Sequence, residues 1–175
     1  MKAIRLIIPA SMTLLLAACG SPDAALNGNG AAGSMAPEQP AAVDSKRLRA
    51  ADSEPDQWMA PGRTYDEQRF SPLKQINDSN VSELGLAWYF DLNTHRGVES
   101  SPLMIDGVLY VISAWNITYA IDARTGKQIW RYDPQVDRSR ARYLCCDVVN
   151  RGISAWKGKI YLTTLDGRLI ELDAR

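Results

Sequence analysis

The sequence predicts an all-β chain built from blade-type repeats, because the chain repeats itself at a fixed interval. Asp106-Gly107-Val108-Leu109-Tyr110 returns as Lys157-Gly158-Lys159-Ile160-Tyr161, and Asp122-Ala123-Arg124 returns as Asp173-Ala174-Arg175. Both pairs of segments are offset by 51 residues, with no gap between them. Short alternating strands repeated at such a period are typical of blade architectures. The second copy reaches Arg175 where the first continues with Thr125-Gly126-Lys127, so we expect the chain to be truncated in mid-repeat.

The first copy predicts four strands, over residues 103–105, 109–113, 117–121 and 128–132. Each is a short apolar or alternating run. Turn-forming residues separate the runs, including Asp106-Gly107 and the 122–126 segment. Four strands joined by tight turns form one antiparallel blade of a β-propeller.

The N-terminus predicts export. Lys2 and Arg5 precede an apolar run over residues 6–18, and its ~13 residues fall short of the ~20 needed to span a bilayer. The following Leu16-Ala17-Ala18-Cys19 resembles the lipobox of bacterial lipoproteins, in which Cys19 is lipidated. Gly20 after it implies outer-membrane sorting by the same resemblance. The alternative is an ordinary signal peptide that happens to contain a cysteine. We therefore expect a signal peptide over residues 1–19.

Residues 20–51 are rich in Ala, Gly, Pro, Ser and Asn, a composition that buries too little apolar surface to order itself. We expect them to form a flexible, disordered tether before a folded region over residues 52–175. The basic cluster at residues 46–49 is interpreted as a solvated charge run, although it could touch anionic lipid.

Composition excludes several function classes. The chain has 20 Lys plus Arg and 20 Asp plus Glu, so no net charge attracts nucleic acid. One histidine, His95, leaves little material for a His-based metal site, and no Cys-x-x-Cys-His is present to attach a c-type haem.

Aligning the copies places Glu99 and Arg151 at the entry to the first strand of successive blades. In a propeller that strand lines the central channel, so the carboxylate and the guanidinium would converge on one ligand. The alternative is that both are turn residues exposed to water.

Cys145 and Cys146 are adjacent. A disulfide between neighbours encloses almost no chain and has strained geometry, so it would act as a contact surface and not as a staple. Two buried free thiols are the alternative, and export favours the disulfide.

Several segments resemble the quinoprotein alcohol dehydrogenases, which depend on pyrroloquinoline quinone (PQQ). The resemblance covers about residues 52–175 and is carried by segments 65–72, 80–88, 96–102, 120–130 and 145–152. It implies the N-terminal portion of an eight-bladed β-propeller of four-stranded antiparallel blades. This portion would contain a closing strand within residues 58–91, which completes the last blade, and about two blades. Trp130 belongs to a tryptophan-docking motif that would pack across to the neighbouring blade.

The same resemblance implies roles for site residues. Glu99 would hydrogen-bond PQQ, and a Cys145–Cys146 disulfide would pack on one face of the cofactor ring. Val149 would form a neighbouring wall, and Arg151 would reach the reactive quinone oxygens. A permanently charged guanidinium suits that place because negative charge develops on oxygen during reduction.

The implied activity is oxidation of primary alcohols to aldehydes in the periplasm by hydride transfer to the quinone, with calcium as Lewis acid. The implied partners are a small alcohol, a cytochrome c or haem-domain electron acceptor, and the outer membrane through the lipid anchor. No calcium ligand or catalytic base is assigned up to Arg175, so both are expected downstream, and this fragment alone is expected to be inactive.

Two alternatives stay open. One is a non-enzymatic β-propeller lipoprotein acting as an outer-membrane assembly scaffold, which the lipobox and tether favour. The other is an inactive truncated remnant. Cys145, Cys146, Glu99 and Arg151 favour the dehydrogenase, because such scaffolds lack them.

Overall fold

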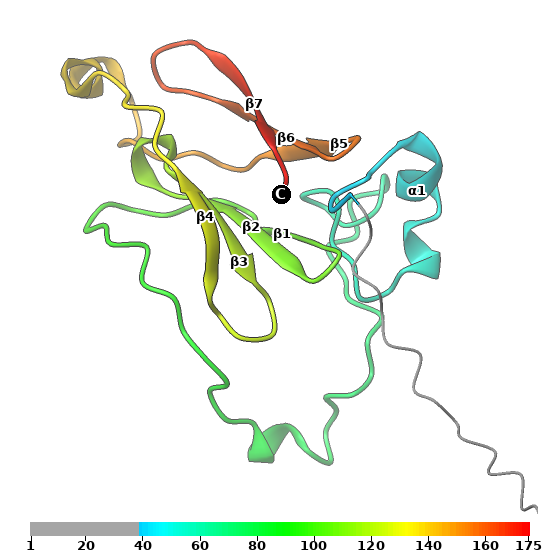
Figure 1. The fold of residues 1–175 in the computed structure, drawn as a ribbon. Helices are drawn as coiled ribbons and strands as arrows, with labels where there is room; N and C mark the ends of the chain where they lie inside the picture. The colour runs from blue at the N-terminus through cyan, green and yellow to red at the C-terminus, as the bar shows by residue number, and fades with distance from the viewer. Residues whose placement is uncertain (1–38) are drawn as a thin grey trace, which may run out of the picture. The chain divides into compact units, whose positions relative to one another are not determined.

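The computed structural model describes residues 39–175, which form two antiparallel sheets (Figure 1). The first sheet contains β1 (Leu103–Ile105), β2 (Val108–Ile112), β3 (Thr118–Asp122) and β4 (Gln128–Tyr132) in sequence order. The second contains β5 (Ser154–Trp156), β6 (Lys159–Thr163) and β7 (Leu169–Asp173). Helical elements are α1 (Ser45–Arg49) and the 3-10 turns η1 (Ala51–Ser53), η2 (Val81–Glu83), η3 (Ala114–Asn116) and η4 (Arg138–Tyr143). The four predicted strands are thus confirmed to within one residue at each end.

Each sheet begins with the same tight hairpin. Asp106 and Gly107 have φ angles of 53° and 80°, and Lys157 and Gly158 have φ angles of 48° and 76°. Two successive positive φ angles match the right-handed twist of the strands that the turn joins. Glycine at the second position adopts this conformation without the steric cost of a Cβ.

The two sheets share one hydrophobic core. Alternate residues of β2 and β6 are buried, as expected for strands with one face inward. The buried apolar side chains of the strands that enter this cluster are Leu103, Ile105, Tyr110, Ile112, Ala120, Ala155, Ile160 and Leu162. Because one cluster draws on both sheets, each sheet buries its apolar face against the other.

Equivalent positions of the repeat join the two sheets just before β1 and β5. Ser101 and Gly152 form a parallel bridge, in which the Ser101 amide donates to the Arg151 carbonyl at 3.1 Å. Ser101 and Gly152 are 51 residues apart, which is the repeat period of the sequence. The two sheets are therefore paired through equivalent positions of successive repeats.

Trp130 docks on the second sheet, as its motif predicts. Its Nε1 donates to the Ala174 carbonyl at 3.2 Å, and the Tyr110 hydroxyl donates to the same oxygen at 3.1 Å. Trp88 makes the matching contact on the first sheet, where its Nε1 donates to the Ala123 carbonyl at 3.1 Å. Ala123 and Ala174 are equivalent positions of the repeat, so the same kind of docking contact occurs twice.

The predicted closing strand is not present as a strand in the described part of the chain. Residues 58–91 form an antiparallel bridge between Trp58 and Met104 but contribute no strand to either sheet. Leu86 and Tyr89 are 82% and 80% exposed. A strand forms only against a neighbour with free backbone groups, and the last blade, to which this segment was expected to pair, is not among these sheets.

The predicted tether extends too far toward the C-terminus. Ala41, Val43 and Ala51 are buried, and the hairpin turn of the second sheet holds the segment through two backbone hydrogen bonds. The Lys157 amide donates to the Val43 carbonyl and the Gly158 amide to the Ala41 carbonyl, both at 2.8 Å. We call residues 41–54 the N-terminal segment. Its small apolar residues are ordered by contacts with distant parts of the chain, which composition does not reveal. The predicted signal peptide, Cys19 and the rest of the tether lie outside the described residues.

The prediction that the basic cluster is a solvated charge run is wrong for Arg47. Its Nη2 lies 2.6 Å from Asp106 Oδ1 and 2.7 Å from Glu54 Oε2. Asp106 also accepts a hydrogen bond from the Ala41 amide at 3.0 Å. The hydrogen bonds that Arg47 donates, first to Glu54 and then to Asp106, raise the pKa of Arg47. Arg47 therefore fastens the N-terminal segment to the β1–β2 turn.

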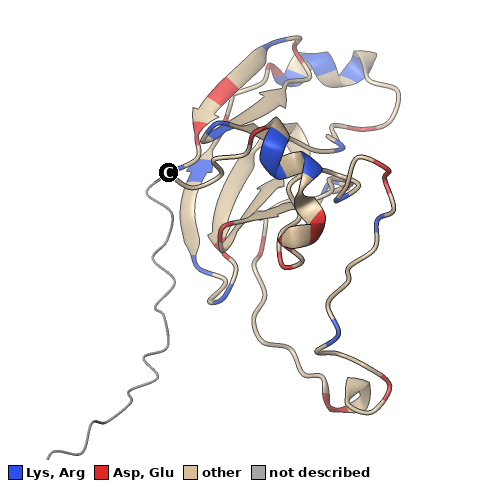
Figure 2. Cartoon of the chain, turned by 90° about the vertical axis from the view of Figure 1, so that its right-hand side faces the viewer, with Lys and Arg blue, Asp and Glu red and all other residues tan. Residues whose placement is uncertain are grey.

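Charges of both signs are distributed along the described chain (Figure 2), in keeping with the equal numbers of basic and acidic residues. Within residues 39–175, the helices are all too short or too polar to traverse a bilayer.

Candidate functional site

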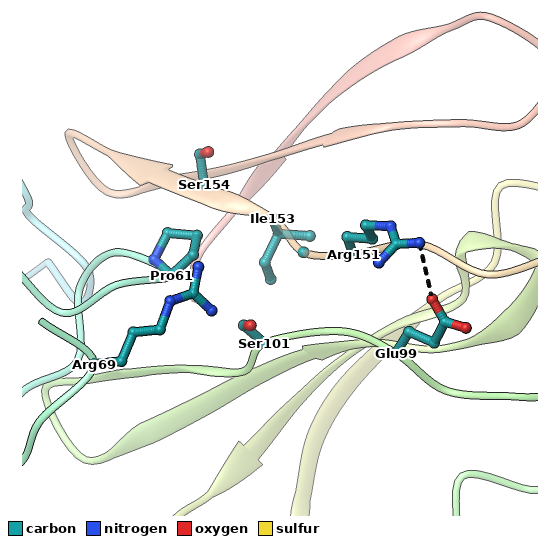
Figure 3. A pocket seen from close by; sticks show the side chains of 8 residues that line it. Pro61, Arg69, Glu99, Ser101, Arg151, Ile153 and Ser154 are labelled. Carbon is teal, nitrogen blue, oxygen red and sulfur yellow. Dashed lines mark ion pairs between the residues drawn. The ribbon is translucent and has the colours of Figure 1, made fainter. Parts of the chain in front are cut away.

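Glu99 and Arg151 meet at the entry to the two sheets (Figure 3). Arg151 Nη2 lies 3.4 Å from Glu99 Oε2, and the two side chains are 80% and 45% exposed. Such an open ion pair adds little to stability because water competes for both charges. The pair is therefore available to a ligand at little cost to the fold.

The two segments that lead into β1 and β5 run side by side. Arg96 Nε donates to Asp147 Oδ1 at 2.9 Å and to Oδ2 at 3.2 Å. A Cβ added at Gly97 would lie 3.6 Å from Val149 Cγ1. These contacts and the Ser101–Gly152 bridge align the two entry segments along their length, and so bring together side chains that are distant in sequence.

A hollow of about 490 Å³ opens beside the Glu99–Arg151 pair. It is lined by Pro61, Arg69, Glu99, Ser101, Arg151, Gly152, Ile153 and Ser154. Figure 3 shows Pro61 and Arg69 on one side and Glu99 and Arg151 on the other. Its volume lies within the range of about 300–1,000 Å³ typical of small-molecule sites. Sequence reasoning did not predict Pro61 or Arg69, since they lie outside the repeats and no motif marks them as site residues.

A second hollow of about 470 Å³ shares Pro61, Arg69 and Ser101 with the first. Its lining includes Ser100, whose Oγ is buried and has no hydrogen-bond partner among residues 39–175. A buried hydroxyl without a partner costs free energy, which a polar ligand atom would recover.

Cys145 and Cys146 are free and exposed, and so differ from both states expected from the sequence. They are neither joined by a disulfide nor buried, and they are absent from the lining of both hollows. The disulfide and its contact with a cofactor stay predictions.

The Cys146 thiol nevertheless lies within the electrostatic reach of the Glu99–Arg151 pair. Its pKa is raised, chiefly by the hydrogen bond and charge of Cys145, with Glu99 adding to the rise and Arg151 opposing it. Val149 is half-buried beside Gly97. Of the five predicted residues, Glu99 and Arg151 line the hollow, and Val149, Cys145 and Cys146 do not.

The described residues offer cations and a carboxylate for a ligand but no metal centre. Between residues 39 and 175 there is no group of three or more His, Cys, Asp or Glu side chains placed to hold a metal ion.

Comparison with known proteins identifies a family and its members. The model of the PQQ family, described as glucose/ethanol/alcohol dehydrogenase, beta-propeller domain, matches residues 58–175. Quinohemoprotein alcohol dehydrogenase ADH-IIG of Pseudomonas putida is 56% identical over 141 residues, which are 81% of this chain and 20% of the relative. The quinohemoprotein alcohol dehydrogenase of Comamonas testosteroni is 48% identical over 166 residues, 95% of this chain and 23% of the relative.

A solved structure of ADHIIG from Pseudomonas putida HK5 superposes with a TM-score of 0.76 at 58% identity, over 78% of this chain and 20% of that one. The chain thus spans about a fifth of the length of these relatives.

Proposed function

The chain belongs to the PQQ family of glucose/ethanol/alcohol dehydrogenase β-propeller domains, and on that premise we propose that it is the N-terminal part of a PQQ-dependent alcohol dehydrogenase. The observation that carries the proposal is the meeting of Glu99 and Arg151, 3.4 Å apart, at the entry of adjacent sheets beside a hollow of about 490 Å³. The segments that lead into β1 and β5 bring an acidic and a basic residue of successive repeats to one place.

The residues present fit PQQ, a flat quinone that carries several carboxylates. Arg151 supplies a planar fork of donors suited to carboxylate or quinone oxygens. Glu99 would accept a hydrogen bond from a ring N–H of the cofactor, and the buried Ser100 Oγ, which has no partner among residues 39–175, could donate or accept one. When bound, PQQ supplies a two-electron acceptor, and the protein supplies position and electrostatics.

Arg151 has the central electrostatic role in this proposal. Its guanidinium would stabilise the negative charge that develops on a quinone oxygen during reduction. The nearby Glu99 carboxylate orients the guanidinium through the 3.4 Å contact. We propose that a Cys145–Cys146 disulfide and Val149 complete the wall of this site.

We propose that the rest of the protein supplies calcium and its ligands, and the base that removes the alcohol proton. The substrates would be primary alcohols oxidised to aldehydes, with a cytochrome c or haem domain as the electron acceptor. The relatives are named quinohemoprotein alcohol dehydrogenases, which supports an alcohol substrate and a haem acceptor. The sequence of residues 1–19 supports a periplasmic location, with Cys19 lipidated and anchored to the outer membrane.

Reconstitution tests the proposal. The complete protein loaded with PQQ and calcium should reduce an artificial electron-accepting dye when supplied with a primary alcohol. Arg151→Lys keeps the charge but loses the planar fork, and Glu99→Gln loses the carboxylate, so each should weaken PQQ binding by about tenfold or more. Arg124→Gln, an exposed residue of the β3–β4 turn, is the matched control.

If the reconstituted protein reduced the dye with no primary alcohol, the proposed alcohol dehydrogenase activity would be excluded. If the folded protein also failed to bind PQQ, the scaffold alternative would be favoured.

A further inference from the structure

A second charged pair, away from the hollow, connects the two entry segments. Arg96 Nε lies 2.9 Å from Asp147 Oδ1 and 3.2 Å from Oδ2, and Arg96 Nη2 also contacts Oδ1. The guanidinium therefore engages the carboxylate through two nitrogens, the strongest and most directional geometry for such a pair. Arg96 and Asp147 are 51 residues apart, so the contact joins equivalent positions of successive repeats.

Asp147 immediately follows the cysteine pair and determines the direction of the chain there. Its φ angle is 70°, in the left-handed region that Asp and Asn tolerate better than most residues. On its C-terminal side Val148 is buried, and its carbonyl accepts a hydrogen bond from the Trp115 amide at 2.9 Å. Asp147 is thus the point at which the chain passes from the exposed cysteine pair into the packed part of the fold.

The Arg96–Asp147 pair is poorly explained as a stabiliser of the fold. Its side chains are 49% and 35% exposed, and ion pairs so accessible to water contribute little to global stability. The pair does restrict the chain locally, because Arg96 lies three residues before Glu99 and Asp147 one residue after Cys146. The hydrogen bond from Arg96 lowers the pKa of Asp147, so the carboxylate stays charged across neutral pH.

We propose that Arg96 and Asp147 are positioning residues that hold the Cys145–Cys146 segment at a fixed place relative to Glu99 and Arg151, and thereby shape the cofactor site. The inference rests on the proposed function, since it takes PQQ as the ligand. Neither residue touches the cofactor. Both act through the backbone between Asp147 and the cysteines.

A double-mutant cycle on the complete protein tests this. The variants are Arg96→Gln, Asp147→Asn and the combination of the two, and Asn preserves tolerance for the left-handed backbone. Each single change should raise the dissociation constant of PQQ by about tenfold, the lower end of what outer-shell partners contribute at metal sites. The combination should be no worse than either single change, because both remove one interaction. Arg96→Lys keeps the positive charge but loses the planar pair of donors, so its dissociation constant for PQQ should lie between those of the parent and Arg96→Gln.

Hydrogen exchange provides a readout that needs no cofactor. In the apoprotein, the Leu144 amide, which donates to the Ala141 carbonyl, and the Trp115 amide, which donates to the Val148 carbonyl, should exchange about tenfold faster in each single variant. The amides of β2 should keep their protection and so report intact folding. Arg131→Gln is the control, because Arg131 is similarly exposed but pairs with Asp133 only two residues away. Its PQQ affinity and its exchange should both equal the parent's.

The outcomes separate the two proposals. A parent protein that fails to bind PQQ would contradict the proposed function, and the exchange measurement would still decide the positioning role. Unchanged exchange of the Leu144 and Trp115 amides would overturn the positioning role, as would additive losses of PQQ affinity in the cycle or an equal loss in Arg131→Gln.

Discussion

Replacing Arg47 by Gln should release the N-terminal segment from the sheets. Asp106, whose side chain is 9% exposed, receives hydrogen bonds from Arg47 and from the Ala41 amide. Removing Arg47 leaves a nearly buried carboxylate with one donor. An exposed pair would cost about 0–1 kcal/mol and a fully buried one about 3–5 kcal/mol. We expect about 2 kcal/mol for this intermediate case, which raises the open population of the segment about 30-fold.

Native-state proteolysis measures this opening. Thermolysin cuts before large aliphatic residues such as Leu48, and its cleavage rate follows the open population when reclosing is fast. Cleavage at Leu48 should therefore be about 30-fold faster in Arg47→Gln than in the parent. Arg49→Gln is the matched control, because Arg49 lies on the same helix and donates only to the Ser45 hydroxyl, at 3.3 Å. Equal cleavage rates in the two variants would refute the reasoning and would favour the flexible tether that composition predicts.

Three further predictions concern the sheets and their turns. Trp130→Phe removes one of two donors to the Ala174 carbonyl and should lower the free energy of unfolding by about 1 kcal/mol, measured by denaturant titration; no loss would show that the docking bond is unimportant. Gly126→Ala should cost about 2 kcal/mol in the same titration, because φ is 71° and the new Cβ would lie 2.7 Å from the Trp88 ring; parent-like stability would contradict that packing. The pKa of Asp166 is lowered to about 2, chiefly by the hydrogen bond from the neighbouring Arg168. The charged Asp166 carboxylate therefore stabilises the folded state at pH values above its unfolded pKa near 3.8, and this contribution is lost as the pH falls toward 2. The difference in free energy of unfolding between the parent and Asp166→Asn should therefore be constant above about pH 5 and shrink between about pH 4 and 2. A difference that does not change with pH would contradict the lowered pKa.

The sheets were predictable from the sequence because their determinants are local. Alternating apolar residues set the strands, and the Asp106-Gly107 and Lys157-Gly158 turns set the hairpins at a fixed period. The same period predicted that Glu99 and Arg151 approach one another. It could also have identified the Arg96–Asp147 pair, since opposite charges stand one repeat apart.

What escaped prediction depends on contacts between distant residues. Arg47 meets Asp106 across 59 positions, and no local pattern distinguishes it from a solvated arginine. Ala41 and Val43 are buried by a hairpin more than a hundred residues away. Arg69 lines the hollow from a segment that has no counterpart in the repeats.

The two tryptophan contacts have a consequence for how a reactive site is added to a repeating scaffold. Trp88 lies 35 residues before its acceptor and Trp130 lies 44 residues before its own, a difference of nine. The extra length falls in the connection that carries η4 and both cysteines, since 14 residues separate Trp88 from β1 and 23 separate Trp130 from β5. Each indole still reaches the matching carbonyl. One connection is thus nine residues longer and carries both cysteines, while successive sheets still interlock in the same way.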